Sequence, residues 1–257
     1  MSDKELKKYL DSLYSKYHKK FSSKDPVWIL HEFYDKKDIE IIGFITSCYT
    51  YGKVESINAF IRKLLNITGN KVHEFTSNYN EHKDKKYFED MYYRFNSPED
   101  LSLLISKIRN VIIEYSSLED LFLKYYSESH ENILPALHAF TKELNEKKGN
   151  EESLKYLVPL AENGSACKRL NLYLRWMVRN DYIDVGIWKN VSVSKLLIPV
   201  DTHVYKVSKI LGLAERNTCD MKFVIELTNK LKTFNAEDPV RYDFAICHAG
   251  MEGFLKS

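Results

Sequence analysis

The sequence predicts an all-α protein of about ten helices joined by short connections. Nine glycines and six prolines are few for 257 residues, which disfavours the many tight turns of a β-sandwich or barrel. Apolar residues recur at helical spacing, and no stretch shows a convincing strand pattern. Hydrophobic residues make up 44% of the chain and charged residues 29%, so there is ample material for a core and disorder is disfavoured.

Four helices are expected before residue 70. They cover residues 3–20, a short segment from Pro26, residues 38–51 and residues 54–67. The first is amphipathic, with Leu6, Leu10, Leu13 and Tyr17 on one face. Residues 38–51 are almost wholly apolar, and this predicts a buried helix.

The middle of the chain shows three more helix starts. Ser97 before Pro98 predicts a cap followed by a helix over residues 97–113. Ser117 repeats this pattern before residues 118–126, and a further helix is expected over 132–144. The polar stretch 142–153 is the clearest loop signal.

Composition and charge exclude several classes of protein. The chain has 38 Lys and Arg against 36 Asp and Glu, so any nucleic-acid surface must come from local clustering. The N-terminus lacks the apolar segment of a signal peptide, and no apolar run approaches the ~18 residues of a membrane span. Four scattered cysteines predict neither disulfides nor a metal or iron–sulfur site. We therefore expect a cytoplasmic protein without a membrane segment, and most of the 18 tyrosines in the core.

Residues 162–181 contain the first candidate site. Asn163, Gly164, Ser165 and Ala166 form a turn of small residues directly before a strong helix, where backbone N–H groups and the helix dipole can bind a phosphate. Lys168 lies in the first turn of that helix, where a positive charge is unfavourable. This position favours the free amine that a nucleophile needs. A solvated lysine is the plainer alternative.

Asp201 is the second candidate. Pro199 ends the preceding segment, and Val204, Val207 and Ile210 follow Asp201 at helical spacing, so it is expected to cap a helix. Residues 196–200, which directly precede this carboxylate, are all apolar. A carboxylate fixed at a helix N-terminus stays ionised and oriented, as a catalytic anion must be. A purely structural cap is the alternative.

Together these two blocks resemble the helix-hairpin-helix (HhH-GPD) DNA glycosylase superfamily. The family hairpin reads Leu-Pro-Gly-x-Gly and leads into a helix with Lys-x-x-Asn. This chain keeps Gly164, Lys168 and Asn171, but Ala166 replaces the second glycine and Glu162-Asn163 replaces Leu-Pro. The Val-Asp-Thr-His element is intact at residues 200–203.

The likeness is firm over residues 157–213 and extends to a bacterial family with Ser-Ala-Cys-Lys-Arg-Leu-Asn and Arg-Trp-Met-Val-Arg motifs. Lys168 and Asp201 are 33 positions apart, because residues 180–194 form an apparent insertion relative to the endonuclease III branch. The archaeal 8-oxoguanine DNA glycosylase branch has a comparably long segment at this place, and the chain resembles that branch in this respect. The cluster cysteines of the endonuclease III branch are absent.

The resemblance implies two all-α lobes with a central cleft in a single glycosylase unit, residues 1–257. Residues 30–165 would form the central lobe, and residues 1–29 with 166–257 the lobe that carries the catalytic aspartate. It further implies a monomer that acts on double-stranded DNA containing a damaged base, without a cofactor or metal.

The resemblance also implies the roles of individual residues. Lys168 would form a Schiff base with the sugar, and Asp201 would assist the reaction. DNA contacts would come from a larger set: Asn163, Gly164, Ser165, Ala166, Arg169, Thr202 and His203.

The base pocket is expected at Cys48, Tyr49 and Tyr51, where the family presents groups near the gap, and at Trp188, whose ring can stack on a purine. For each of these residues, core packing is the alternative. The expected function is a base-excision glycosylase with abasic-site lyase activity on an oxidised base, 8-oxoguanine being favoured. A monofunctional glycosylase for another damaged base and a non-catalytic helical DNA-binding module stay open.

Overall fold

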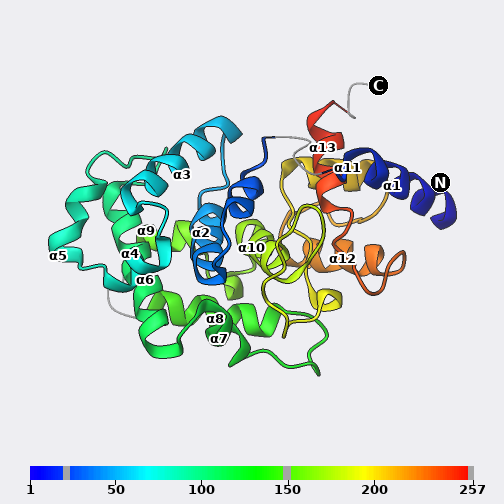
Figure 1. Cartoon of the computed structure of the whole chain (residues 1–257). Helices are drawn as coiled ribbons and strands as arrows, with labels where there is room; N and C mark the ends of the chain where they lie inside the picture. Colours follow the sequence, from blue (N-terminus) through cyan, green and yellow to red (C-terminus); the bar gives the residue numbers. More distant parts are fainter. Residues whose placement is uncertain (20–23, 147–151, 254–257) are drawn as a thin grey trace. The chain divides into compact units, whose positions relative to one another are not determined.

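The computed structural model (Figure 1) describes residues 1–19, 24–146 and 152–253. Thirteen α-helices and four 3-10 helices occur in these residues, and no strand does. Three isolated β-bridges are the only extended pairings among them. The all-α prediction is therefore confirmed.

The chain divides into two compact units. Unit 1 contains residues 1–23, 128–134 and 161–257, and unit 2 contains residues 24–127 and 135–160. The assignment of these units as the lobes of a glycosylase stays a prediction.

Unit 2 is built around the expected apolar helix. Its elements are η1 (Pro26–Glu32), α2 (Lys36–Cys48), α3 (Val54–Thr68), α4 (Val72–Asn78), α5 (Glu81–Asp84), η2 (Lys85–Phe88), α6 (Pro98–Tyr115), α7 (Leu118–Leu123), most of α8 (Leu134–Glu146) and α9 (Glu152–Leu157). Every residue of α2 from Ile39 to Cys48 is buried, as its apolar sequence predicts. The helix ends at Cys48, before residue 51, because the chain turns there: Tyr49 N–H donates to the carbonyl of Thr46.

Local capping chemistry defines several helices of unit 2 as expected. Ser97 and Asp100 form a reciprocal capping box at the start of α6. Ser117 accepts a hydrogen bond from the backbone of Asp120 and begins α7. Gly69 ends α3 with a left-handed φ of 60°.

Several elements differ from the sequence prediction in type or in boundary: α1 ends at Tyr17, before residue 20, and α6 ends at Tyr115, after residue 113. The segment after Asp25 is a 3-10 helix, and α7 ends at Leu123, before residue 126. Helix α8 begins at Leu134, after residue 132, because the side chain of Asn132 accepts a hydrogen bond from Leu134 N–H. The predicted loop 142–153 lies partly outside the described residues.

Unit 1 contains both candidate motifs. Its elements are α1 (Asp3–Tyr17), η3 (Ala161–Asn163), α10 (Lys168–Val178), η4 (Val193–Lys195), α11 (Thr202–Ile210), α12 (Met221–Lys232) and α13 (Asp243–Met251). The predicted apolar face of α1 is buried, and α13 packs against both α1 and α11. No helix of the described residues is both long and apolar enough to cross a membrane.

Candidate active site

A tight turn precedes α10. Gly164 has a φ of 76° and Cys167 a φ of 45°, so the chain passes through two left-handed residues. The carbonyl of Gly164 accepts a hydrogen bond from Met221 N–H at 2.9 Å, and Ser165 forms an isolated bridge with Asp220. The turn is therefore held against the N-terminus of α12.

Asn171 holds the same turn from within the core. Its buried side chain donates from Nδ2 to the carbonyl of Ala166 at 3.1 Å. Its own N–H donates to the carbonyl of Cys167 at 2.9 Å, and Cys167 N–H donates to Ser165 Oγ at 3.3 Å. Asn171 therefore fixes the turn. The sequence motif alone does not predict this positioning role.

Lys168 is the first residue of α10 and is half-buried. The capping residue, Cys167, makes no side-chain hydrogen bond to the helix. The N–H groups of a first helical turn have no partner within their own helix and create a positive end. Lys168 therefore begins the helix at the end that favours an anion, as the sequence predicts.

Asp201 caps α11 as expected. Its Oδ1 accepts hydrogen bonds from His203 N–H and Val204 N–H, both at 2.8 Å. Residues 196–200, which lead into it, are all buried. Its Oδ2 accepts a hydrogen bond from the Cys247 thiol at 3.4 Å. The carboxylate is therefore fixed at both oxygens, from its own helix and from α13.

Asp220, next to Cys219 at the start of α12, contacts the turn before α10. Burial raises the pKa of the Cys219 thiol, and the negative charges of Asp220 and Asp201 add to this rise. Asp220 is the residue that forms a bridge with Ser165 of the turn. The turn before α10 is therefore in contact with the start of α12. We define the candidate active site as this turn, Lys168 and the Asp201 cap of α11, all of which belong to unit 1.

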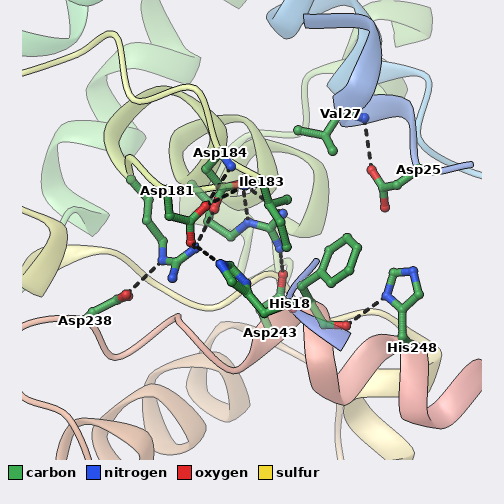
Figure 2. Close-up of polar contacts among 12 residues, drawn as sticks. His18, Asp25, Val27, Asp181, Ile183, Asp184, Asp238, Asp243 and His248 are labelled. Carbon is green, nitrogen blue, oxygen red and sulfur yellow. Dashed lines mark hydrogen bonds and ion pairs between the residues drawn. The ribbon is translucent and has the colours of Figure 1, made fainter. Parts of the chain in front are cut away.

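Unit 1 also contains a buried cluster of charges (Figure 2). Arg175 of α10 contacts Asp184 at 3.1 Å and also pairs with Asp243, the first residue of α13. One turn later, Arg179 contacts Asp184 at 3.0 Å and Asp238 at 2.8 Å. These two arginines join α10 to three separate segments of unit 1.

The outer edge of the cluster is formed by Asp181. It pairs with Arg179, lies 2.9 Å from His18 Nε2, and accepts backbone hydrogen bonds from Ile183 and Asp184 (Figure 2). Burial acts to raise the pKa of Asp181, but the His18 contact and the charge of Arg179 outweigh it and hold that pKa well below its usual range.

For Asp243, the effect of burial on the pKa outweighs the effect of the nearby arginine. Burial raises the pKa of Asp243 to about 7, the charge of Arg175 opposes this rise, and the charge of Asp201 adds to it. Asp243 and Cys247 are four residues apart on α13 and so lie on the same face of the helix. Helix α13 therefore links the Arg175 pair to the thiol that contacts Asp201.

Sequence reasoning missed this cluster. Its signal is present, because Arg175 stands among the apolar residues 172–178 and Arg179 directly follows them, and such arginines, when buried, must find partners. The aspartates that serve as partners are spread over residues 181–243, and no local pattern identifies them.

The expected base-pocket residues are placed differently. Cys48 and Tyr49 are fully buried in unit 2, where the Tyr49 ring packs on Phe60 with centroids 4.4 Å apart. Trp188, in unit 1, is 1% exposed and meets Tyr173 edge to face at 5.4 Å. These three groups have almost no exposed surface. Their placement supports the packing alternative.

Tyr51 alone of the four keeps a partly exposed ring, in unit 2. The expected DNA contacts Asn163, Gly164, Ser165 and Thr202 are exposed, and Ala166, Arg169 and His203 are half-buried. Gly250 of α13 packs closely on His203: a Cβ at residue 250 would lie 2.8 Å from the His203 Cβ. In the described part of the chain, no group of three His, Cys, Asp or Glu side chains is arranged to hold a metal.

The chain belongs to a family described as a protein of unknown function (DUF2400), whose model matches residues 25–252. No curated protein and no solved structure matches the chain.

Proposed function

We propose that this member of the DUF2400 family is a DNA base-excision glycosylase with abasic-site lyase activity, in which Lys168 is the nucleophile and Asp201 its electrostatic partner. The HhH-GPD resemblance of residues 157–213 suggests this reaction class. The geometry of unit 1 supports it.

The observation that carries the proposal is the state of Asp201. Asp181, Asp184, Asp238 and Asp243 each pair with an arginine. In the described residues, by contrast, no lysine, arginine or histidine side chain forms an ion pair with Asp201. A fixed, half-buried carboxylate without a cationic partner is suited to stabilise a positive charge that arises on a substrate.

The reaction then proceeds in two stages. The Lys168 amine attacks C1′ of the target sugar, the N-glycosidic bond breaks, and the base leaves with the bonding electron pair and takes up a proton. Asp201 accepts a proton from the attacking amine or stabilises positive charge on the sugar while this bond breaks. The C1′–O4′ bond of the resulting aminal then opens, O4′ takes up a proton, and a protonated imine forms between Lys168 and C1′. This imine loses a C2′ proton, and the 3′-phosphate departs by β-elimination, which nicks the strand.

The turn at residues 163–167 would position the DNA. Its backbone and the positive end of α10 suit a phosphate, and such contacts fix register without reading sequence. A base inside a duplex must first rotate out of the stack before C1′ can be attacked. As substrate we favour an oxidised purine, because of the long segment between Lys168 and Asp201.

Borohydride trapping tests the proposal. Borohydride reduces the imine between enzyme and sugar to a stable amine, so incubation with DNA containing a damaged base or an abasic site should yield a covalent adduct. Lys168→Gln should abolish this adduct. Lys4→Gln, which changes an exposed lysine in the first turn of α1, is the matched control and should leave it intact.

The outcomes separate three mechanisms. An adduct that persists in Lys168→Gln would refute the assigned nucleophile. Base excision without any adduct would indicate a monofunctional glycosylase. DNA binding with neither excision nor adduct would indicate a non-catalytic module.

A further inference from the structure

The turn at residues 92–96 of unit 2 exposes aromatic rings to an unusual degree. The Phe95 side chain is 76% exposed and the Tyr92 side chain 69% exposed. Tyr156 of α9, 43% exposed, lies 6.2 Å from Phe95 between ring centroids, edge to face. Exposed rings contribute little to the core, so their presence at one place indicates a contact surface.

The turn that presents Phe95 is rigid. Tyr93 and Asn96 exchange two backbone hydrogen bonds of 3.0 and 2.9 Å, and Arg94 between them has a left-handed φ of 53°. Both anchoring side chains are buried: the Tyr93 hydroxyl donates to the Tyr51 carbonyl, and Asn96 Nδ2 donates to Asp100 at 3.1 Å. Little conformational freedom would therefore be lost when Phe95 binds a ligand.

Arg94 adds a cation to these rings. Its guanidinium lies 5.7 Å from the Phe95 ring centroid and 6.0 Å from that of Tyr51. The arginine packs against Gly52, where a Cβ would lie 2.6 Å from Arg94 Nη1. A guanidinium beside exposed rings provides both a stacking plane and a charge for a phosphate.

The class of ligand follows from the rings and the guanidinium. Lys53 and Lys155 add two cations on the segments that carry the rings, while Glu55 and Asp90 directly adjoin those segments. Both lysines are exposed. Aromatic faces interleaved with cations fit a polyanion that has flat, unpaired rings.

We propose that Tyr51, Arg94, Phe95 and Tyr156 form a nucleic-acid stacking surface that binds an unpaired base and its adjacent phosphate. This inference rests on DNA as the ligand of the proposed function, but it assigns a separate contact on unit 2. It requires neither the amine of Lys168 nor an excisable base.

Fluorescence titration tests this surface with a probe that has no damaged base. The probe is a DNA duplex with 2-aminopurine in a single-base bulge, and its reference is the same duplex without the bulge. The wild-type protein should quench the 2-aminopurine and should bind the bulged duplex more tightly than the continuous one. Phe95→Ala should weaken binding to the bulged duplex roughly ten-fold, since a stacked base is lost.

Three further variants make the test specific. Phe95→Tyr should retain binding, because the ring remains. Arg94→Gln should weaken binding and reduce its salt dependence, since a phosphate contact is lost. Tyr34→Ala is the matched control, because Tyr34 is a 99% exposed ring of the same unit beside Glu32 and Asp35, and it should have no effect.

The proposal is overturned if Phe95→Ala binds the bulged duplex as well as the wild type does, or if Tyr34→Ala weakens binding equally. Circular dichroism of Phe95→Ala verifies that the exposed substitution leaves the helices intact. Borohydride trapping at saturating enzyme should remain positive in Phe95→Ala. Failure of the stacking surface is thereby distinguished from failure of the Lys168 mechanism.

Discussion

The thiol of Cys247 lies 3.4 Å from Oδ2 of Asp201 and joins α13 to the cap of α11. The other carboxylate oxygen of Asp201 accepts two backbone N–H groups. One oxygen therefore caps the N-terminus of α11, while the other accepts a hydrogen bond from a side chain in a distant part of the sequence. A weak thiol donor leaves this second oxygen more available to a cationic substrate than an arginine would.

The Cys247 contact predicts a positioning role in excision. Cys247→Ala removes the donor, and we expect the single-turnover rate to fall about five-fold, since one hydrogen bond contributes about 1 kcal/mol. Cys247→Ser keeps a donor and should stay near the wild-type rate. The same assay with excess enzyme measures both variants.

A rate equally low in Cys247→Ser would contradict the hydrogen-bond explanation. Thermal unfolding of Cys247→Ala separates this effect from a packing defect. A thermal midpoint near that of the wild type is expected, because Cys247 is only partly buried.

Asp201→Asn should lower the excision rate by at least ~10²-fold, the scale for one preorganised group. Asparagine is as good an N-cap as aspartate, so stability should change little. DNA affinity should stay constant or rise, since a negative charge near phosphates is removed. Asp35→Asn, a substitution at the exposed cap of α2, is the matched control and should leave excision unchanged.

The result that refutes a catalytic Asp201 is equally clear. If Asp201→Asn excises at nearly the wild-type rate while its thermal midpoint drops, the residue is only a helix cap.

Asp243 predicts a pH dependence of stability. Its pKa rises from 3.8 to about 7 on folding, mainly through burial. Between these values the folded state holds a proton that the unfolded chain has lost, so the free energy of unfolding decreases as pH rises. This stabilising contribution is complete below pH 3.8 and is lost as pH passes about 7.

Urea unfolding of wild type and Asp243→Asn at about pH 5.5 and about pH 8 measures this dependence. The variant lacks the titrating group, so its stability should change less between the two pH values. Groups distant from Asp243 contribute alike to both proteins. Equal pH dependence in both proteins would show that Asp243 does not titrate in this window.

Much of the local structure around the site could be predicted from the sequence because it depends on near neighbours. The cap of Asp201 involves residues two and three positions away, and the turn at Gly164 is signalled by its small residues. The amphipathic face of α1 follows from spacing alone. Such features need no knowledge of tertiary structure.

The partners of buried charges could not be predicted in this way. Arg175 pairs with Asp243 across 68 positions, and Cys247 meets Asp201 across 46. The exposure of a ring is equally nonlocal: Trp188 and Phe95 both lie in irregular segments, yet one is buried and the other exposed. These outcomes depend on which segments meet in the fold.

The proposed substrate yields the last prediction. The length of the segment between Lys168 and Asp201 and the absence of cluster cysteines favour an oxidised purine. A buried Trp188 removes one expected stacking group, so purine selection would depend on other residues.

We still expect a duplex containing 8-oxoguanine to be cut faster than one containing thymine glycol or uracil. A side-by-side single-turnover assay with equal enzyme excess measures the three rates. Faster cutting of either pyrimidine lesion would overturn the substrate assignment, while a retained Lys168 adduct would leave the mechanism standing.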